Sequence, residues 1–149
     1  MSSFLLALTP TAVTQRLRRT AVGNSVNAKK VTLILDACFT GDGRNAGLLA
    51  ARTARIKPKQ INLQGNMVVF SASSGDQTAL PYKEKKHGYF TYYILKKLQE
   101  TKGNISYGDL SDYVTTNVQL ETTIKIKPQD PQINASELAT NTWRNWRFR

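Results

Sequence analysis

Two stretches of the chain are almost continuously apolar and rich in β-branched residues. They are KVTLILDA at residues 30–37 and MVVFSAS at residues 67–73. A strand with one solvent-facing side alternates apolar and polar residues, whereas a strand covered on both faces shows an unbroken apolar run. The two stretches therefore predict central strands of one sheet.

Two later segments repeat apolar residues at helical spacing instead. Residues 88–100 and residues 106–118 each place an apolar stripe on one face of a helix. Ser106 is the expected N-cap of the second helix, because Asp109 follows three residues later in the arrangement of a capping box. Both segments are therefore predicted to be amphipathic helices that pack on the sheet.

Two further helices are expected from weaker patterns. One lies at residues 11–22, and the other is a short helix near residues 46–54, inside an exposed connection over residues 41–66. The order of strand, connection, strand, helix and helix is typical of an α/β fold with a parallel sheet. We expect one domain over residues 1–149, since no shift in composition divides the chain.

Composition narrows the class of protein. With 40% hydrophobic residues among 149, the chain can bury one sizeable core. A single Cys and a single His exclude an internal disulfide, a paired-cysteine zinc motif and a site of several histidines. No apolar stretch approaches the roughly 20 residues of a membrane-spanning helix. We therefore expect a cytoplasmic protein that does not bind a membrane.

The net charge of +11 raises the question of nucleic-acid binding. The basic residues are scattered along the chain, and no recognised nucleic-acid motif accompanies them. A generally basic surface, or one that needs an acidic neighbour, explains the charge more simply. Nucleic acid therefore ranks last among the partners that we expect.

The single cysteine, Cys38, directly follows the first predicted strand and precedes a glycine-bearing loop. Unpaired cysteine is among the most buried residue types, so one interpretation is that Cys38 fills the core. The other is that Cys38 is a nucleophile at the carboxyl end of the strand, where open parallel α/β sheets bind ligands.

Asp36 lies two residues before Cys38, so the two side chains share one face of an extended strand. A nearby carboxylate raises the pKa of a thiol, which makes Asp36 a poor activator of Cys38. A carboxylate at a buried strand end also needs a partner. We therefore expect Asp36 to bind a cationic group of a substrate, as the floor of a pocket for Arg or Lys.

At this point the chain resembles the caspase-like cysteine peptidases, in particular the bacterial caspase homologues and the metacaspases. The resemblance spans roughly residues 30–135 and is carried, in order, by LILDACFTG, MVVFSASSGDQTA, HGYFTYYILKKLQ and KPQDPQI. Animal caspases have the pattern Q-A-C-x-G around their nucleophile, whereas this chain has Asp36 at the Gln position. An Asp there is found in metacaspase-type enzymes, which cleave after Arg or Lys.

The resemblance implies a fold, an activity and a set of site residues. The fold is a three-layer α/β fold with a mostly parallel central sheet, and the activity is that of a cysteine endopeptidase. Cys38 is the implied nucleophile, and its backbone N–H joins the oxyanion hole. Ser73 and Asp76 are implied to line the specificity pocket beside Asp36. The implied partner is a peptide or protein substrate with basic residues.

The chain departs from the family pattern at the general base. That base is a His followed by Gly, about 50 residues upstream of the cysteine, which from Cys38 falls before Met1. We therefore expect a caspase-like domain that is incomplete at its N-terminus and works with a separate His-bearing segment or chain. His87, in KKHGYF, is the alternative base, but relatives have HG-x-F-T at the start of a helix there, and that interpretation is favoured.

Neither a cofactor nor a metal ion is expected. Metacaspases are often activated by calcium, which needs six to eight oxygen ligands, but Asp42 is the only acid between residues 39 and 75. Three functions stay open: a peptidase chain, a catalytically inactive caspase-like binding or regulatory module, and a basic nucleic-acid-binding protein.

Overall fold

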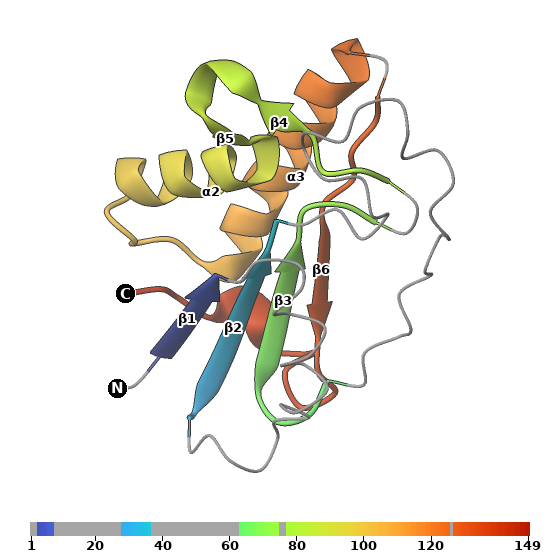
Figure 1. Cartoon of the computed structure of the whole chain (residues 1–149). Helices are drawn as coiled ribbons and strands as arrows, with labels where there is room; N and C mark the ends of the chain where they lie inside the picture. Colours follow the sequence, from blue (N-terminus) through green and yellow to red (C-terminus); the bar gives the residue numbers. More distant parts are fainter. Residues whose placement is uncertain (1–2, 8–27, 37–62, 75–76, 126) are drawn as a thin grey trace.

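A four-stranded sheet forms the centre of the molecule (Figure 1). The computed structural model describes residues 3–7, 28–36, 63–74, 77–125 and 127–149. The strand order is β1-β2-β3-β6, with β1 at Ser3–Ala7, β2 at Lys30–Leu35, β3 at Met67–Ser71 and β6 at Gln132–Ala135. The first three strands are parallel and β6 is antiparallel to β3. The predicted α/β fold with a mostly parallel sheet is confirmed.

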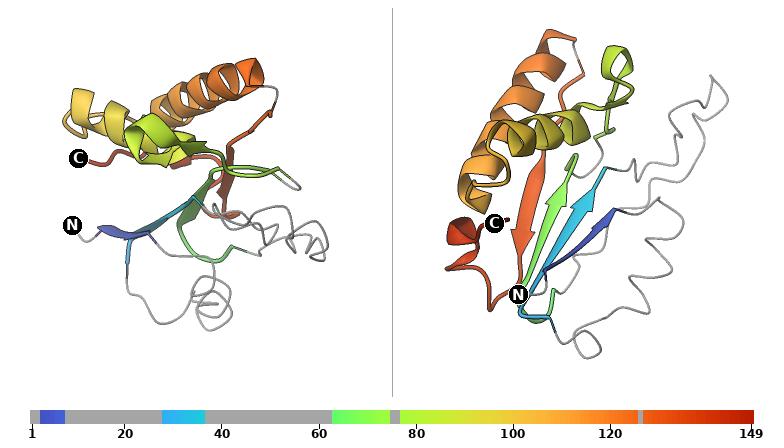
Figure 2. Two further views of the ribbon diagram at one scale, coloured as in Figure 1. Left: turned by 45° about the horizontal axis from the view of Figure 1, so that its top comes forward. Right: turned by 90° about the vertical axis from the view of Figure 1, so that its left-hand side faces the viewer.

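Two α-helices, α2 at Tyr89–Glu100 and α3 at Tyr107–Ile124, lie on the same face of the sheet (Figure 2). A small hairpin of β4 (Pro81–Tyr82) and β5 (His87–Gly88) leads into α2, with the 3-10 turn η2 (Lys83–Lys85) between its strands. A second 3-10 turn, η3 (Trp143–Asn145), lies near the C-terminus. Among the described residues, no helix is long and apolar enough to cross a bilayer.

The predicted elements that fall on described residues are confirmed, with shifted ends. Each of the two central strands ends two residues earlier than predicted, and the first helix begins one residue later. The second helix is longer, because it continues past Val118 to Ile124. The helices predicted at 11–22 and 46–54 lie outside the described residues.

The sheet buries both of its faces, as the unbroken apolar runs predict. On β3, Val68 and Phe70 face the two helices, whereas Met67 and Val69 belong to a separate cluster on the opposite face. The side chains alternate because successive residues of a strand point to opposite sides of the sheet. On β2, Leu33 and Leu35 join the opposite cluster in the same way.

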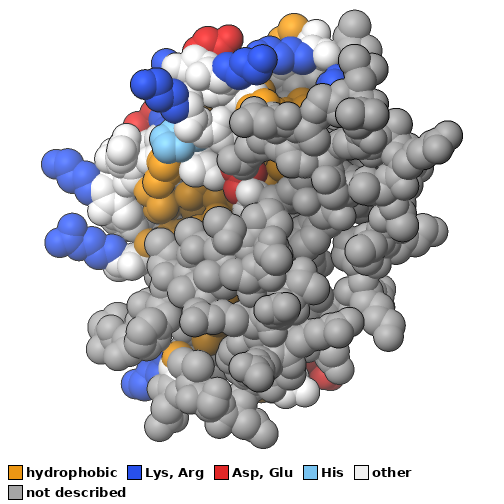
Figure 3. Space-filling view, in the orientation of Figure 1, with side chains coloured by type: hydrophobic (Ala, Val, Ile, Leu, Met, Phe, Trp, Pro, Cys, Tyr) orange, Lys and Arg blue, Asp and Glu red, His pale blue; other side chains and the backbone are white. Residues whose placement is uncertain are grey.

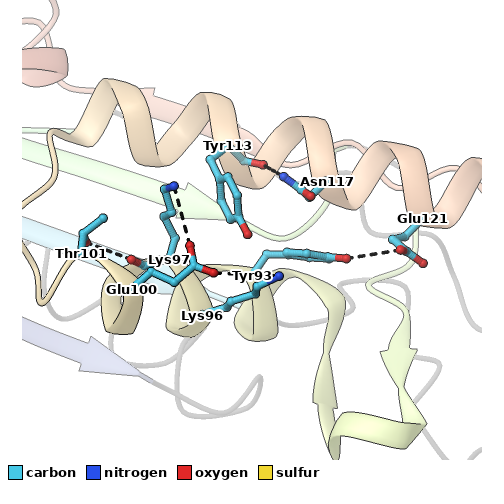
Figure 4. Close-up of polar contacts among 8 residues, drawn as sticks. All are labelled: Tyr93, Lys96, Lys97, Glu100, Thr101, Tyr113, Asn117 and Glu121. Carbon is cyan, nitrogen blue, oxygen red and sulfur yellow. Dashed lines mark hydrogen bonds and ion pairs between the residues drawn. The ribbon is translucent and has the colours of Figure 1, made fainter.

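Aromatic rings hold α2 against α3 (Figure 4). The ring of Tyr93 meets the ring of Tyr113 edge-on, with 6.1 Å between centroids, and the Lys97 ammonium lies 4.6 Å from the Tyr113 ring centre. The Tyr93 hydroxyl is directed at Glu121, 3.4 Å away. Burial, reinforced by the charge of Glu121, raises the pKa of Tyr93, so this phenol stays neutral.

The hairpin is also fixed to both helices by rings. Tyr82 of β4 stacks on Tyr89, the first residue of α2, with centroids 4.4 Å apart. Lys125, just after α3, donates a hydrogen bond to the Tyr89 hydroxyl and lies over both rings. The start of α2 is therefore held by the hairpin on one side and by the end of α3 on the other.

The C-terminal segment, which contains Arg144, Arg147 and Arg149, packs into the core. Trp146 is buried, and the ring of Phe148 stacks on Tyr107 at 4.3 Å. The backbone N–H of Tyr107 donates to the carbonyl of Trp146 over 2.8 Å. This segment therefore covers the N-terminal turn of α3.

A buried hydrogen bond joins the sheet to the same turn. The hydroxyls of Thr32 on β2 and Tyr107 on α3 lie 2.6 Å apart, and both residues are buried. Burial raises the pKa of Tyr107, while the hydrogen bond to Thr32 opposes that rise. The pair lets two polar groups lie inside an apolar core.

We expect Tyr107→Phe to lower the free energy of unfolding by about 2 kcal/mol, since it leaves the buried Thr32 hydroxyl without this partner. Adding Thr32→Val should recover most of the loss, because removing both partners of a buried hydrogen bond is nearly neutral. Urea unfolding of the two single variants and the double variant measures the coupling. Tyr113→Phe is the matched control. Additive losses in the double variant would contradict the assignment.

Candidate active site

Asp36 is the first residue after β2 and lies at the carboxyl end of the parallel strands. Its side chain faces the helices, as the alternation along β2 predicts, because the Thr91 hydroxyl of α2 donates a hydrogen bond to Asp36 Oδ2 over 2.5 Å. The carboxylate is half-buried, and its Oδ1 atom is shielded from solvent. An acidic group is thus held at the edge of the sheet where α/β proteins bind ligands.

The amino end of α2 lies against this carboxylate. Gly88 is the N-cap of α2, and an ideal Cβ on Gly88 would approach Asp36 Oδ1 to 2.9 Å and Oδ2 more closely still. The whole of α2 is described, and its first turn contains no acidic residue. Asp36 therefore brings a negative charge to the end of the helix where backbone N–H groups and the helix dipole favour one.

The turn that follows β3 borders Asp36 on the neighbouring strand. The N–H of Ala72 donates to the carbonyl of Leu35 over 2.8 Å, which continues the pairing of β2 and β3 by one residue. Ser73 comes next, and its hydroxyl donates to the carbonyl of Gln77 over 3.1 Å. Ser73 and Asp36 thus belong to the same edge of the sheet, while Cys38 and Asp76 lie outside the described residues.

The side chain of Gln129 closes this turn from inside. It is completely buried; its Nε2 donates to the carbonyl of Ala72 over 2.7 Å, and its Oε1 accepts from the N–H of Leu80 over 2.8 Å. Its own N–H donates to the Thr122 hydroxyl of α3 over 3.1 Å. One amide therefore satisfies the backbone of Ala72, just after β3, and of Leu80, just before β4.

A second polar pair fastens the outer part of the turn. The N–H of Asp130 donates to Oε1 of Gln77 over 2.7 Å, and Gln77 Nε2 donates back to the Asp130 carboxylate. Gln119 of α3 donates to the other carboxylate oxygen over 2.8 Å. These donors, Gln77 first, lower the pKa of Asp130.

His87 lies in β5, one residue before the N-cap of α2, which is where the start-of-helix interpretation puts it. Its imidazole is exposed, and the pale blue atoms in Figure 3 mark it on the surface. Among the described residues, no group of three His, Cys, Asp or Glu side chains is placed to hold a metal ion.

Four site residues were not singled out in the sequence: Gly88, Thr91, Gln129 and Gln77. Each lies in one of the motifs that carry the family resemblance, HG-x-F-T for the first two, KPQDPQI for Gln129 and GDQTA for Gln77. The motifs marked where these residues are, but their partners are visible only in the folded chain.

The comparisons with known proteins agree with this architecture. A family model described as the caspase domain matches residues 5–142. The crystal structure of caspase-1 from Spodoptera frugiperda superposes with a TM-score of 0.51 at 13% sequence identity, over 89% of this chain and 57% of that one. The chain therefore spans little more than half the length of that caspase. No curated protein sequence matches the chain.

We expect Gln129→Met, which keeps the length of the side chain, to lower the free energy of unfolding by about 3 kcal/mol. The loss follows because the N–H of half-buried Leu80 and the carbonyl of buried Ala72 both lose their partner. Gln132→Met, at an exposed position of β6, is the control and should change stability by less than about 0.5 kcal/mol. Chemical unfolding compares the two, and equal losses would refute the role of Gln129.

The lowered pKa of Asp130 predicts a dependence of stability on pH. A carboxyl group whose pKa is lower in the folded protein stabilises the fold above its unfolded pKa, and that contribution is lost as pH falls through the folded pKa. Asp130→Asn should therefore be less stable than the wild type at pH 7, and the difference should shrink below about pH 4. Thermal unfolding at pH 7 and below about pH 4, with Asp112→Asn as control, measures the difference in stability. A difference that is the same at both pH values would count against it.

Proposed function

Since the chain belongs to the caspase domain family, which comprises cysteine peptidases, we propose that it carries the nucleophile and the specificity pocket of a cysteine endopeptidase that cleaves after Arg or Lys. Cys38 is the proposed nucleophile. Asp36, Ser73 and Asp76 are the proposed pocket residues. The substrate is a peptide or protein with basic residues.

The observation that carries this proposal is the position of Asp36. Its carboxylate lies at the carboxyl end of β2, on the side where α2 begins, and borders the turn that contains Ser73. A carboxylate there favours an ammonium or guanidinium group, and a guanidinium can make two parallel hydrogen bonds to it. The side chain of an Asp residue in a substrate would instead meet a like charge.

The proposed chemistry is acyl transfer to sulfur. The Cys38 thiolate attacks the scissile carbonyl carbon, and the oxyanion that forms is stabilised by backbone N–H donors that include the one of Cys38. The C–N bond then breaks, and the leaving amine takes the proton that the thiol gave to the general base. Water finally attacks the thioester, releases the peptide acid and restores the thiol.

The proposed general base is a group other than His87. His87, the single histidine of the chain, is exposed on the hairpin. We propose that the imidazole comes from a separate His-bearing segment or chain. The exposure of His87 equally favours the second candidate function, in which the chain is an inactive caspase-like binding or regulatory module that keeps the pocket.

For the isolated chain we expect alkylation of Cys38 but negligible hydrolysis of Arg, Lys and Asp peptide substrates. A cysteine thiol without a neighbouring imidazolium keeps a pKa of about 8.5, so only a few per cent is thiolate at neutral pH. A peptidyl chloromethyl ketone with Arg should inactivate Cys38 at least about tenfold faster than the same reagent with Asp, and Asp36→Asn should remove that preference. Mass spectrometry follows the alkylation.

Asp112→Asn, at an exposed position of α3, is the matched control and should keep the preference for Arg. Addition of the His-bearing segment distinguishes the two functions, since a peptidase then turns over Arg substrates and a binding module does not. A preference for the Asp reagent, or a preference for Arg that survives Asp36→Asn in a folded chain, would refute the pocket. Turnover by the isolated chain that is lost in both Cys38→Ala and His87→Ala would make His87 the base.

A further inference from the structure

We infer that Thr91 and Gly88, both at the amino end of α2, are positioning residues that orient the Asp36 carboxylate for a basic substrate side chain. The inference rests on the proposed function, because it assigns a role to the residues that hold the proposed pocket floor. Under this inference, the HG-x-F-T motif positions Asp36 and does not take part in general acid–base catalysis.

The first observation is the hydrogen bond from Thr91. The Thr91 hydroxyl lies 2.5 Å from Asp36 Oδ2, and both residues are half-buried. The last torsion of an Asp side chain is soft, so a carboxylate without a firm donor samples a wide range of planes. A hydroxyl donor on one oxygen restricts that plane. A planar guanidinium is recognised through the same plane, so the donor prepares the carboxylate for Arg.

The second observation is the close approach of Gly88. The backbone of Gly88 has φ −74° and ψ 156°, which any residue can adopt, so glycine is not required there for its conformational freedom. Space is the constraint, because a Cβ would lie within 3.0 Å of three atoms of the Asp36 carboxyl group. The backbone of Gly88, in β5 of the hairpin, therefore limits sterically where the Asp36 carboxylate can lie.

The two contacts act on one group from one helix end. Thr91 is the third residue of α2 and Gly88 is its N-cap, so the same rigid turn supplies both the donor and the steric limit. The positive end of the helix dipole points at the carboxylate from the same side and favours its negative charge. The start of α2 thus fixes where Asp36 lies and how its plane is turned.

A purely structural role makes a different prediction. If Asp36 only completed the end of α2, breaking the contact would change stability and leave the discrimination between substrates intact. If Thr91 positions the pocket floor, breaking the contact weakens the binding of a basic side chain and leaves the reactivity of Cys38 unchanged. The binding and reaction steps of an affinity label separate these two cases.

The test uses the full chain and a peptidyl chloromethyl ketone that ends in Arg, beside the same peptide that ends in norleucine. Thr91→Val should raise the inactivation constant KI for the Arg label about tenfold, with its maximal rate unchanged. KI for the norleucine label and the rate with iodoacetamide should not change. Thr91→Ser, which restores the hydroxyl, should return KI to within about twofold of the wild type.

Thr101→Val is the matched control at the other end of α2, where the Thr101 hydroxyl bonds the carbonyl of Lys97. Thr101→Val should leave KI for both labels, the maximal inactivation rate and the rate with iodoacetamide unchanged. Gly88→Ala is the second, independent variant, since its methyl group would overlap the Asp36 carboxylate and displace it while leaving the Thr91 hydroxyl in place. It should raise KI for the Arg label as Thr91→Val does, and it decides the question where Thr91→Val does not fold.

Two results would overturn the inference. If Asp36→Asn abolishes the preference for Arg while Thr91→Val and Gly88→Ala only lower the melting temperature, the pocket stands and the positioning role is wrong. If Asp36→Asn also leaves the preference intact, the proposed pocket fails and the positioning role fails with it. Circular dichroism at the assay temperature establishes which variants are folded.

Discussion

The buried amide of Gln129 is the contact on which the arrangement of the site depends. Ala72, just after β3, is buried and Leu80, just before β4, is half-buried, and backbone groups that are removed from water need a partner. A primary amide can donate and accept at once, so one side chain bonds both groups. Leu80 then accepts from the N–H of Tyr89, the first residue of α2, over 3.1 Å. The position of α2 at its amino end, and with it the contacts to Asp36, therefore follows from a residue near the C-terminus.

Contacts within the fold compensate the Asp36 carboxylate for its loss of hydration. A carboxylate that is removed from water loses hydration, and it stays at a buried strand end only where donors replace that hydration. The hydroxyl of Thr91 and the amino end of α2 provide this replacement, and α2 gains a charge that its own first turn lacks. The same contacts restrict the carboxylate before any ligand arrives. A basic side chain that binds there would thus lose less free energy in ordering its partner than it would with a mobile surface Asp.

The elements that the sequence predicts correctly are those in which local pattern and burial agree. The two central strands are buried on both faces, and Ser106 is the N-cap of α3 as predicted, since the N–H of Asp109 donates to the Ser106 hydroxyl over 3.1 Å. The last turns of α3 were missed because the positions that would continue the apolar stripe beyond Val118 hold the polar residues Glu121 and Thr122. Strand β6 was missed because its four residues alternate between exposed and half-buried positions and carry no strong signal.

In the candidate site, too, local sequence pattern predicts some features and not others. Period-two alternation predicts that Asp36 and Cys38 share one face of the strand, but it does not say which face. That Asp36 lies on the side of the helices is visible only in the folded chain. The roles of Thr91 and Gln129 could not be read locally, since their partners lie 55 and 57 residues away and polar residues in a helix or a connection are usually solvated. The burial of Trp146 was not predicted either, since three Arg residues surround it in the sequence. Long-range polar contacts, rather than hydrophobic pattern, are what the sequence alone did not reveal.

Because the chain is strongly basic, the proposed binding of a basic side chain depends on how Asp36 is oriented. At a net charge of +11 the long-range field of the chain opposes the approach of a basic peptide, and lysine and arginine side chains project around the hairpin and α2 (Figure 3). That field is screened over about 8 Å at physiological salt, whereas a half-buried carboxylate acts at contact distance in a medium of lower dielectric constant. Attraction to a basic side chain must therefore arise inside the pocket and not from steering. A contact of that kind depends on geometry, so the plane in which α2 holds one carboxylate matters more than the number of acids nearby.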